Sequence, residues 1–303
     1  MINLGYRVLD GFKVNLFQIN NVMLGIATDI GPRILFLAHK DSPDLNIFGI
    51  VPEITVETSE GLWRIFGGHR LWVSPEAMPR SYSLDDKPVE IKVRDNEIIV
   101  RGNPETVNMV QKEIIIRPGP SDNSVEVIHR ITNIGRWDIE FACWALSVMR
   151  RNGFAIIPIK SRCIDEKCLL PDRAIALWPY TKLADYRVKF SNNFIFIKHD
   201  ERVREPIKIG ARAYPYWAAY YVDNYVFIKK FHPGETLRYP DFDVYVEVYA
   251  NDKILELETL GPLRRVSPGE ANIHREIWYL ARVGLLEPRE DDIMSRVEPL
   301  TSI

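Results

Sequence analysis

Short apolar segments separated by turn residues restrict the fold of this chain more than any other feature of its sequence. Turn-forming pairs such as Asn20-Asn21 and Asp95-Asn96 separate these segments at intervals of about ten residues. This arrangement is typical of consecutive antiparallel strands joined by short turns. The expected strands are residues 12–19, 22–30, 33–40, 89–93, 97–101, 107–117, 124–132, 140–149, 194–199, 216–222, 225–231 and 244–249.

Helical periodicity is poor outside one segment near the end of the chain. Residues 288–297 begin with Pro288, carry acidic residues in the first turn, and place Ile293, Met294 and Val297 on one face. We therefore predict an all-β protein, a large antiparallel two-sheet β-sandwich with one short C-terminal helix. No repeat, low-complexity tract or long linker divides the sequence, so we expect one domain over residues 1–303.

Charge and composition argue against nucleic-acid and membrane partners. The formal net charge is −2, and no block of Lys or Arg is present. The first residues lack the basic and apolar regions of a secretory signal, and no apolar run approaches the roughly 20 residues of a membrane helix. We expect a soluble, cytoplasmic protein. The scarcity of glutamine, found at Gln18 and Gln111, together with abundant charge is typical of thermophile proteins.

Three cysteines are too few for a disulfide framework in a chain of this length. Cys163 and Cys168 flank a short loop that a bridge could close. Two reduced thiols are the favoured interpretation for an intracellular protein. No further Cys or His lies near this pair in sequence, so a zinc site is not indicated.

The segment 254–258 alternates Leu255 and Leu257 with Glu256 and Glu258, as expected for a strand with one apolar and one acidic face. The acidic face either receives a ligand or is simply the solvated side of an antiparallel strand. After two turns, His274 and the residues that follow return to an extended pattern. His274 and Glu276 share a strand face, and a surface pair is a better interpretation than a metal site because no third ligand is evident.

A glycine pair introduces the most conspicuous loop of the sequence, residues 67–76. The pair allows a close backbone approach, and His69, Arg70 and Trp72 follow it. These side chains could place an imidazole, a guanidinium and an indole at the edge of one pocket. Alternatively, His69 and Arg70 hydrogen-bond to neighbouring loops while Trp72 belongs to the core.

Several segments together resemble galactose-mutarotase-like (aldose 1-epimerase-like) proteins. The segments are LELETLGP at 255–262, PGE at 268–270, HREIWYL at 274–280, GGHRLWVSPE at 67–76, WALSVM at 144–149, LWPYTKL at 177–183 and RYPDFD at 238–243. The resemblance covers most of the chain. The sequence is more similar to an uncharacterised branch of the superfamily than to the mutarotases themselves. The resemblance implies a carbohydrate-binding β-sandwich in which Glu258 is the catalytic base of anomer interconversion.

The sequence departs from that resemblance at Trp144. In the family, the histidine that serves as general acid lies at or beside this position. An indole cannot exchange a proton at neutral pH. His69 is therefore our candidate for a substitute acid. Arg70 and Asp241 would bind sugar hydroxyls.

Large aromatic residues would shape the apolar wall of the site, and these are Trp72, Trp144 and Trp178. No cofactor is implied, and the expected partner is a carbohydrate or a sugar phosphate. Two alternatives stay open. The protein could bind sugar without turnover, or it could be a hexose-phosphate epimerase in which Arg70, Arg212 or Lys229 holds the phosphate.

Overall fold

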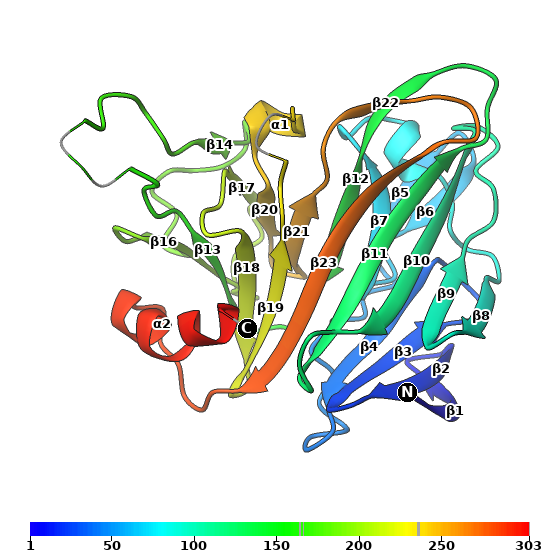
Figure 1. Cartoon of the computed structure of the whole chain (residues 1–303), viewed down its shortest axis with the longest axis horizontal. Helices are drawn as coiled ribbons and strands as arrows, with labels where there is room; N and C mark the ends of the chain where they lie inside the picture. Colours follow the sequence, from blue (N-terminus) through cyan, green and yellow to red (C-terminus); the bar gives the residue numbers. More distant parts are fainter. Residues whose placement is uncertain (164, 166, 235–236, 303) are drawn as a thin grey trace.

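The computed structural model describes residues 1–163, 165, 167–234 and 237–302, and two large antiparallel sheets lie face to face (Figure 1). The first sheet has eleven strands and the second has ten. In spatial order the first contains β1 (Ile2–Leu9), β2 (Phe12–Ile19), β3 (Val22–Ala27), β4 (Arg33–His39), β7 (His69–Ser74), β12 (Ile139–Val148), β21 (Leu255–Leu260), β20 (Val246–Ala250), β17 (Ile207–Ala211) and β14 (Ile175–Leu177), with β22 (Arg264–Val266) paired to β12.

The second sheet contains, in order, β15 (Val188–Phe190), β16 (Phe194–Lys198), β13 (Phe154–Pro158), β18 (Trp217–Val222), β19 (Tyr225–Phe231), β23 (Ala271–Arg282), β11 (Ser124–Asn133), β10 (Val110–Pro118), β9 (Glu97–Arg101) and β8 (Glu90–Arg94). A separate hairpin joins β5 (Thr55–Thr58) and β6 (Gly61–Arg64). The predicted all-β sandwich is thus confirmed.

Helices are short and lie outside the sheets. The predicted C-terminal helix is α2 (Glu290–Arg296), followed by the single turn α3 (Glu298–Thr301). α2 buries Ile293 against an apolar cluster on the outer side of the second sheet that includes Phe194 and Trp217. One further turn, α1 (Pro240–Asp243), and a 3₁₀ turn over Arg80–Tyr82 complete the helical structure of the described residues. None of the described helices is long and apolar enough to cross a membrane.

The strands at the centre of the first sheet are buried on both faces. All residues of β7 and β21 are buried, and so are eight of the ten residues of β12. Their side chains therefore divide by position into two sets, because successive residues of a strand point to opposite sides of the sheet. One set enters the space between the sheets, and the other lies on the far face of the first sheet, which we call the pocket face.

Two local predictions differ from the structure. Residues 69–74, predicted as a loop, form strand β7, because the turn made by the two glycines ends before His69. Cys163 and Cys168, expected as free thiols, are joined in a disulfide, since the short loop brings their Cα atoms to 5.6 Å. Cys143 is the buried free cysteine of the described chain.

Candidate functional site

Two glycines set the direction in which β7 presents its side chains. Gly67 and Gly68 have positive φ angles of 100° and 65°. A Cβ atom on Gly68 would lie 2.4 Å from the carbonyl oxygen of Ile34, so neither the conformation nor the space suits another residue. The strand that follows places His69 toward the second sheet and Arg70 on the pocket face.

Strand register gathers charged residues into rows on the pocket face. Leu146 on β12 is paired with Arg70 on one side and Glu258 on the other. Glu258 is in turn opposite Glu247 on β20. In an antiparallel sheet, directly opposite residues have their side chains close together on one face.

A pocket of about 320 Å³ opens on this face. Its volume is at the small end of the range for ligand sites, which run from about 300 to 1,000 Å³. The residues that line it include charged groups, aromatic rings and aliphatic side chains. They are Ile54, Val56, Trp63, Ile65, Arg70, Trp72, Glu76, Tyr82, Trp144, Leu146, Tyr180, Pro206, Lys208, Tyr249, Asn251, Ile254, Glu256 and Glu258.

Glu258 lies in the wall of this pocket with its carboxyl group held at one oxygen. Its Oε2 accepts a hydrogen bond from Nε1 of Trp144 at 2.9 Å and lies 3.1 Å from Nζ of Lys208. Its Oε1 is buried and has no hydrogen-bond partner. Burial raises the pKa of Glu258, although the Lys208 ammonium acts in the opposite direction.

Lys208 connects Glu258 to a second buried carboxyl group. Its Nζ lies 2.7 Å from Oε2 of Glu247. The same nitrogen lies over the rings of Trp144 and Trp178, at 4.4 and 4.7 Å from the ring centres. Burial opposes its charge, but Glu247 and Glu258 outweigh that effect and raise the pKa of Lys208. Burial also raises the pKa of Glu247 well above its ordinary value. Two carboxyl groups thus compete for one ammonium.

Arg70 forms the second charged pair of the pocket. Its Nη1 lies 2.5 Å from Oε1 of Glu256, and its guanidinium lies 4.4 Å from the centre of the Trp72 ring. The Trp72 ring also contacts the rings of Trp63 and Trp144, with centroids 5.2 and 5.5 Å apart. The pair is therefore enclosed by aromatic side chains.

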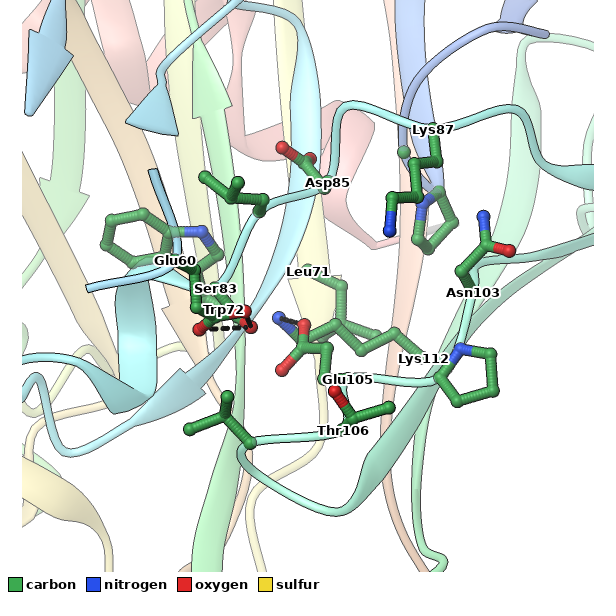
Figure 2. A pocket seen from close by; sticks show the side chains of 15 residues that line it. Glu60, Leu71, Trp72, Ser83, Asp85, Lys87, Asn103, Glu105, Thr106 and Lys112 are labelled. Carbon is green, nitrogen blue, oxygen red and sulfur yellow. Dashed lines mark hydrogen bonds and ion pairs between the residues drawn. The ribbon is translucent and has the colours of Figure 1, made fainter. Parts of the chain in front are cut away.

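A second cavity of about 310 Å³ lies behind Trp72, and Figure 2 shows its polar lining. Ser83 donates a hydrogen bond to Glu60 there, and Lys112 is paired with Glu105 at 2.5 Å. These four groups already have partners. We therefore take the pocket that contains Glu258 as the candidate site.

The structure brings four of the predicted site residues together. Arg70, Trp72, Trp144 and Glu258 all line the pocket. Trp178 does not line the pocket, but its ring contacts the ammonium group of Lys208, which does.

The other predicted residues lie elsewhere. Asp241, in the turn α1, is not among the pocket-lining residues, and Arg212 donates a hydrogen bond to the hydroxyl of Tyr245. His69 and Lys229 lie between the sheets, on the opposite face of the first sheet from Glu258, so the expected convergence of His69 with Glu258 is wrong.

The residues between the sheets form a second polar cluster, which we call the interior network. It consists of His69, His129, His274, Lys229, Thr259 and Glu276. His274 and Glu276 were predicted to be a surface pair, but both are buried there because β23 lies in the middle of the second sheet.

The hydrogen bonds of the interior network fix the form of its histidines. Nδ1 of His129 faces the carbonyl oxygen of His274 at 3.3 Å, and a carbonyl oxygen can only accept, so this nitrogen carries the hydrogen. Burial lowers the pKa of His129 to about 4 and the pKa of His69 well below its ordinary value, so both rings are neutral at pH 7. In a neutral His129 ring, Nε2 accepts from Nε2 of His69 at 2.7 Å, and Nδ1 of His69 then accepts from the hydroxyl of Ser147.

Glu276 is the anion of the interior network. It lies 3.4 Å from Nζ of Lys229 and accepts hydrogen bonds from Thr259 and from Nε1 of Trp278. Burial opposes its ionisation, but Lys229 together with the neighbouring histidines and Thr259 outweighs that effect, and the pKa of Glu276 is lowered to about 2.

The ligand-type atoms of His69, His129 and Glu276 lie within 4.8 Å of one another, a donor set that zinc accepts. Hydrogen bonds already occupy Nε2 of both rings, and the Lys229 ammonium already balances the carboxylate. The cluster fits a closed hydrogen-bonded network better than a metal centre.

Sequence reasoning missed Lys208, Glu247 and Glu76 as members of the site. The first two have a signal in the sequence, because each is a single charge between apolar residues in a strand, in IKIG and VEVY. Such a residue is buried with a partner when both faces of the strand are covered. Glu76 stands in the segment of residues 67–76, which we had already singled out.

Comparison with known proteins identifies the fold. Neither protein-family profiles nor curated protein sequences match this chain. One similar structure is a TPR-domain-containing protein from Parabacteroides distasonis, with a TM-score of 0.58 and 13% identity over 92% of this chain and 49% of that chain. A second is a candidate mutarotase from Salmonella typhimurium, with a TM-score of 0.56 and 11% identity over 91% of this chain and 93% of that chain. A third is a galactose mutarotase-like protein from Lactobacillus casei, with a TM-score of 0.52 and 10% identity over 88% of this chain and 100% of that chain. The chain spans about half the length of the first of these.

The chain therefore has the galactose-mutarotase-like fold, as the sequence resemblance indicated. At identities of 10–13%, this similarity establishes the fold and not the activity.

Proposed function

We propose that the pocket binds a pyranose sugar and that the protein interconverts its anomers, as an aldose 1-epimerase. The observation that carries the proposal is the state of Glu258. Its side chain is buried in the pocket wall, one carboxyl oxygen has no hydrogen-bond partner, and its pKa is raised. A general base works best when its pKa lies near the working pH, and burial moves the pKa of Glu258 in that direction.

In this proposal Glu258 removes the proton of the O1 hydroxyl group. The bond between C1 and the ring oxygen breaks, the ring oxygen gains a proton, and an open-chain aldehyde forms. Rotation about the bond between C1 and C2, followed by the reverse steps, closes the ring with either configuration. The protein gains no net proton over the cycle.

Lys208 takes the second role in place of His69, which the structure sets between the sheets. Its ammonium lies 3.1 Å from Glu258 and stays charged because two carboxyl groups raise its pKa. A fixed positive charge beside the ring oxygen would stabilise the negative charge that develops there, while water delivers the proton. The rings of Trp72 and Trp144 would contact the apolar faces of the sugar.

A sugar-binding protein without turnover is the second candidate. No histidine lines the pocket within the described chain, and Trp144 and Lys208 both hold Glu258 in its charged form. The hexose-phosphate variant has less support. Arg70 is already paired with Glu256, Lys229 lies between the sheets, and Arg212 bonds to Tyr245.

The substitution Glu258→Gln separates the two candidates. Glutamine keeps the shape and one acceptor but cannot take a proton, so turnover should fall by about 10²–10⁴ while sugar affinity changes little. Polarimetry or NMR exchange on freshly dissolved aldoses measures the rate, and titration measures the affinity. Glu57→Gln, at an exposed position of the neighbouring strand β5, is the matched control and should retain turnover.

A binding protein would give a different result. The wild-type protein would not accelerate anomerisation above the rate in buffer. Glu258→Gln would then weaken sugar affinity by about 1–3 kcal/mol, the cost of disturbing a buried polar partner. That pair of results would overturn the epimerase proposal and leave the sugar site in place.

A further inference from the structure

The charges of the pocket do not balance. Its cations are Arg70 and Lys208, and each is in contact with a carboxylate. Glu256 neutralises Arg70, and Glu258 neutralises Lys208 even when Glu247 keeps a proton. The remaining acidic residue of the lining, Glu76, is therefore not compensated.

Glu76 is available to a ligand. Its carboxyl group accepts a hydrogen bond from the hydroxyl of Tyr82, and no Lys or Arg of the described residues forms an ion pair with it. It is an exposed residue of the pocket lining, and its charge acts on Tyr180 and Lys208 across the pocket. The same pocket holds the unpartnered Oε1 of the buried Glu258.

Aromatic side chains accompany this excess negative charge. Tyr82, Tyr180 and Tyr249 line the pocket together with Trp63 and Trp144. Aromatic faces attract ligand cations, and groups of aromatic rings recognise ammonium ligands in other proteins. A carboxylate beside such rings adds a charged acceptor for an ammonium group. An anionic ligand would meet no cation that lacks a partner, and it would be repelled by Glu76.

We propose that the sugar recognised by this pocket carries an ammonium group, so that the ligand class is amino sugars, with Glu76 as the specificity-determining residue. The inference rests on the proposed sugar site. It does not require turnover, because a charge preference appears in binding alone. The ammonium would lie within hydrogen-bonding distance of Glu76 and beside the tyrosine rings.

Titration calorimetry with glucosamine, glucose, N-acetylglucosamine and glucose 6-phosphate tests the proposal at about pH 6, where a sugar amine is protonated. Glucosamine should bind about three- to tenfold more tightly than glucose, the size expected for one charge-assisted hydrogen bond. N-Acetylglucosamine should lose this advantage, and glucose 6-phosphate should bind most weakly. At about pH 9, where the amine is neutral, the preference for glucosamine should disappear.

The substitution Glu76→Gln assigns the preference to one residue. It removes the charge and keeps an acceptor, so glucosamine affinity should fall about three- to tenfold while glucose affinity falls less. The control Glu57→Gln makes the same change of charge on an exposed position outside the lining and should keep the preference.

Two results would overturn the inference. Glucosamine could bind no more tightly than glucose, or Glu76→Gln could weaken both sugars equally. Anomerisation of glucose without an amine preference would refute the inference and leave the epimerase proposal intact. An amine preference without anomerisation would support the inference and refute the epimerase proposal. The two failures are therefore distinguishable.

Discussion

Two buried charged clusters lie on opposite faces of the same central strands, and they differ in completeness. In the interior network, the carboxylate of Glu276 meets a cation and two hydrogen-bond donors. On the pocket face, one oxygen of Glu258, both oxygens of Glu247 and Nε of Arg70 have no hydrogen-bond partner, and Glu247 is held by its ion pair with Lys208. Buried polar groups are nearly always satisfied, so the unsatisfied set marks the face prepared for a ligand.

The two clusters also hold their protons differently. At Glu276, Lys229 and the groups around it together overcome the effect of burial and lower the pKa to about 2, while burial lowers the pKa of His274 to about 3. These charge states are fixed at neutral pH. Burial raises the pKa of Glu258 and Glu247, so these carboxyl groups hold a proton to a higher pH than an exposed glutamate does. The interior network therefore fits a structural role, and the proposed chemistry belongs to the pocket face.

The same substitution on the two faces should have very different effects on stability. Glu276→Gln leaves the Lys229 ammonium buried without its counter-charge, and losing one partner of a buried pair costs about 3–5 kcal/mol. Glu258→Gln relieves the crowding of two carboxyl groups around Lys208, so the free energy of unfolding should change by less than about 1 kcal/mol. Urea denaturation of both variants measures the difference.

Equal losses of stability in the two variants would contradict the distinction between the networks. Lys229→Met with Glu276→Gln provides the control, because it removes both charges together. This double variant should recover part of the lost stability, since replacing a whole buried pair by apolar or neutral groups is often close to neutral.

Acidification should lower the free energy of unfolding through the histidines of the interior network. The pKa of His129 is about 4 in the folded protein against an ordinary value of 6.5, so between these pH values the unfolded chain binds a proton that the folded chain does not. The contribution of neutral His129 to the free energy of unfolding is therefore complete above pH 6.5, and it is lost as the pH falls toward 4. The slope is up to about 1.4 kcal/mol per pH unit for one histidine.

The pocket face should show the opposite sign. The raised pKa of Glu247 means that the folded chain holds a proton that the unfolded chain releases above its ordinary pKa of 4.5, so this group lowers stability as the pH rises. Unfolding by urea at a series of pH values, for wild type, His129→Gln and Glu247→Gln, measures both slopes. His129→Gln should flatten the acidic limb, and Glu247→Gln should raise stability more at about pH 8 than at about pH 5, because the cost of the raised pKa of Glu247 grows as the pH rises above 4.5. A steeper acidic limb in His129→Gln would refute the neutral assignment.

Alternation and turn residues were sufficient to predict the fold. The strands β9 and β19 were predicted to the residue, because each is bounded by an aspartate–asparagine turn with positive φ angles. A strand through residues 254–258 was also predicted, and it is β21 (Leu255–Leu260), with Glu256 and Glu258 on one face. Four of the residues predicted for the site line one pocket.

The errors at the site come from strands that are buried on both sides. In such a strand the pattern does not show which face meets the other sheet, so Lys229 could not be told from Lys208. The opposition of Glu247 to Glu258 depends on register between strands, which sequence spacing does not give. The error with His69 was avoidable, because adjacent strand residues cannot face one pocket together.

The smallest predicted effect concerns two tryptophans, one in each cluster. Nε1 of Trp144 donates to Glu258 at 2.9 Å, and Nε1 of Trp278 donates to Glu276 at 2.7 Å. Substitution by phenylalanine keeps an aromatic ring and removes that donor, so each variant should lose about 1–2 kcal/mol of stability. Stability alone does not distinguish the two clusters here.

The pH dependence of the site does distinguish them. A hydrogen bond to a carboxylate favours its charged form, so Trp144→Phe should raise the pKa of Glu258 and move the pH profile of anomerisation toward higher pH by up to about one unit. Trp278→Phe should leave that profile unchanged, because Lys229 and Thr259 still keep Glu276 charged on the other side of the sheet. Polarimetry across the pH range, with both variants, measures the profile. An equal shift in both would mean that the two clusters share a proton through the sheet, and their separation into a structural and a chemical face would then fail.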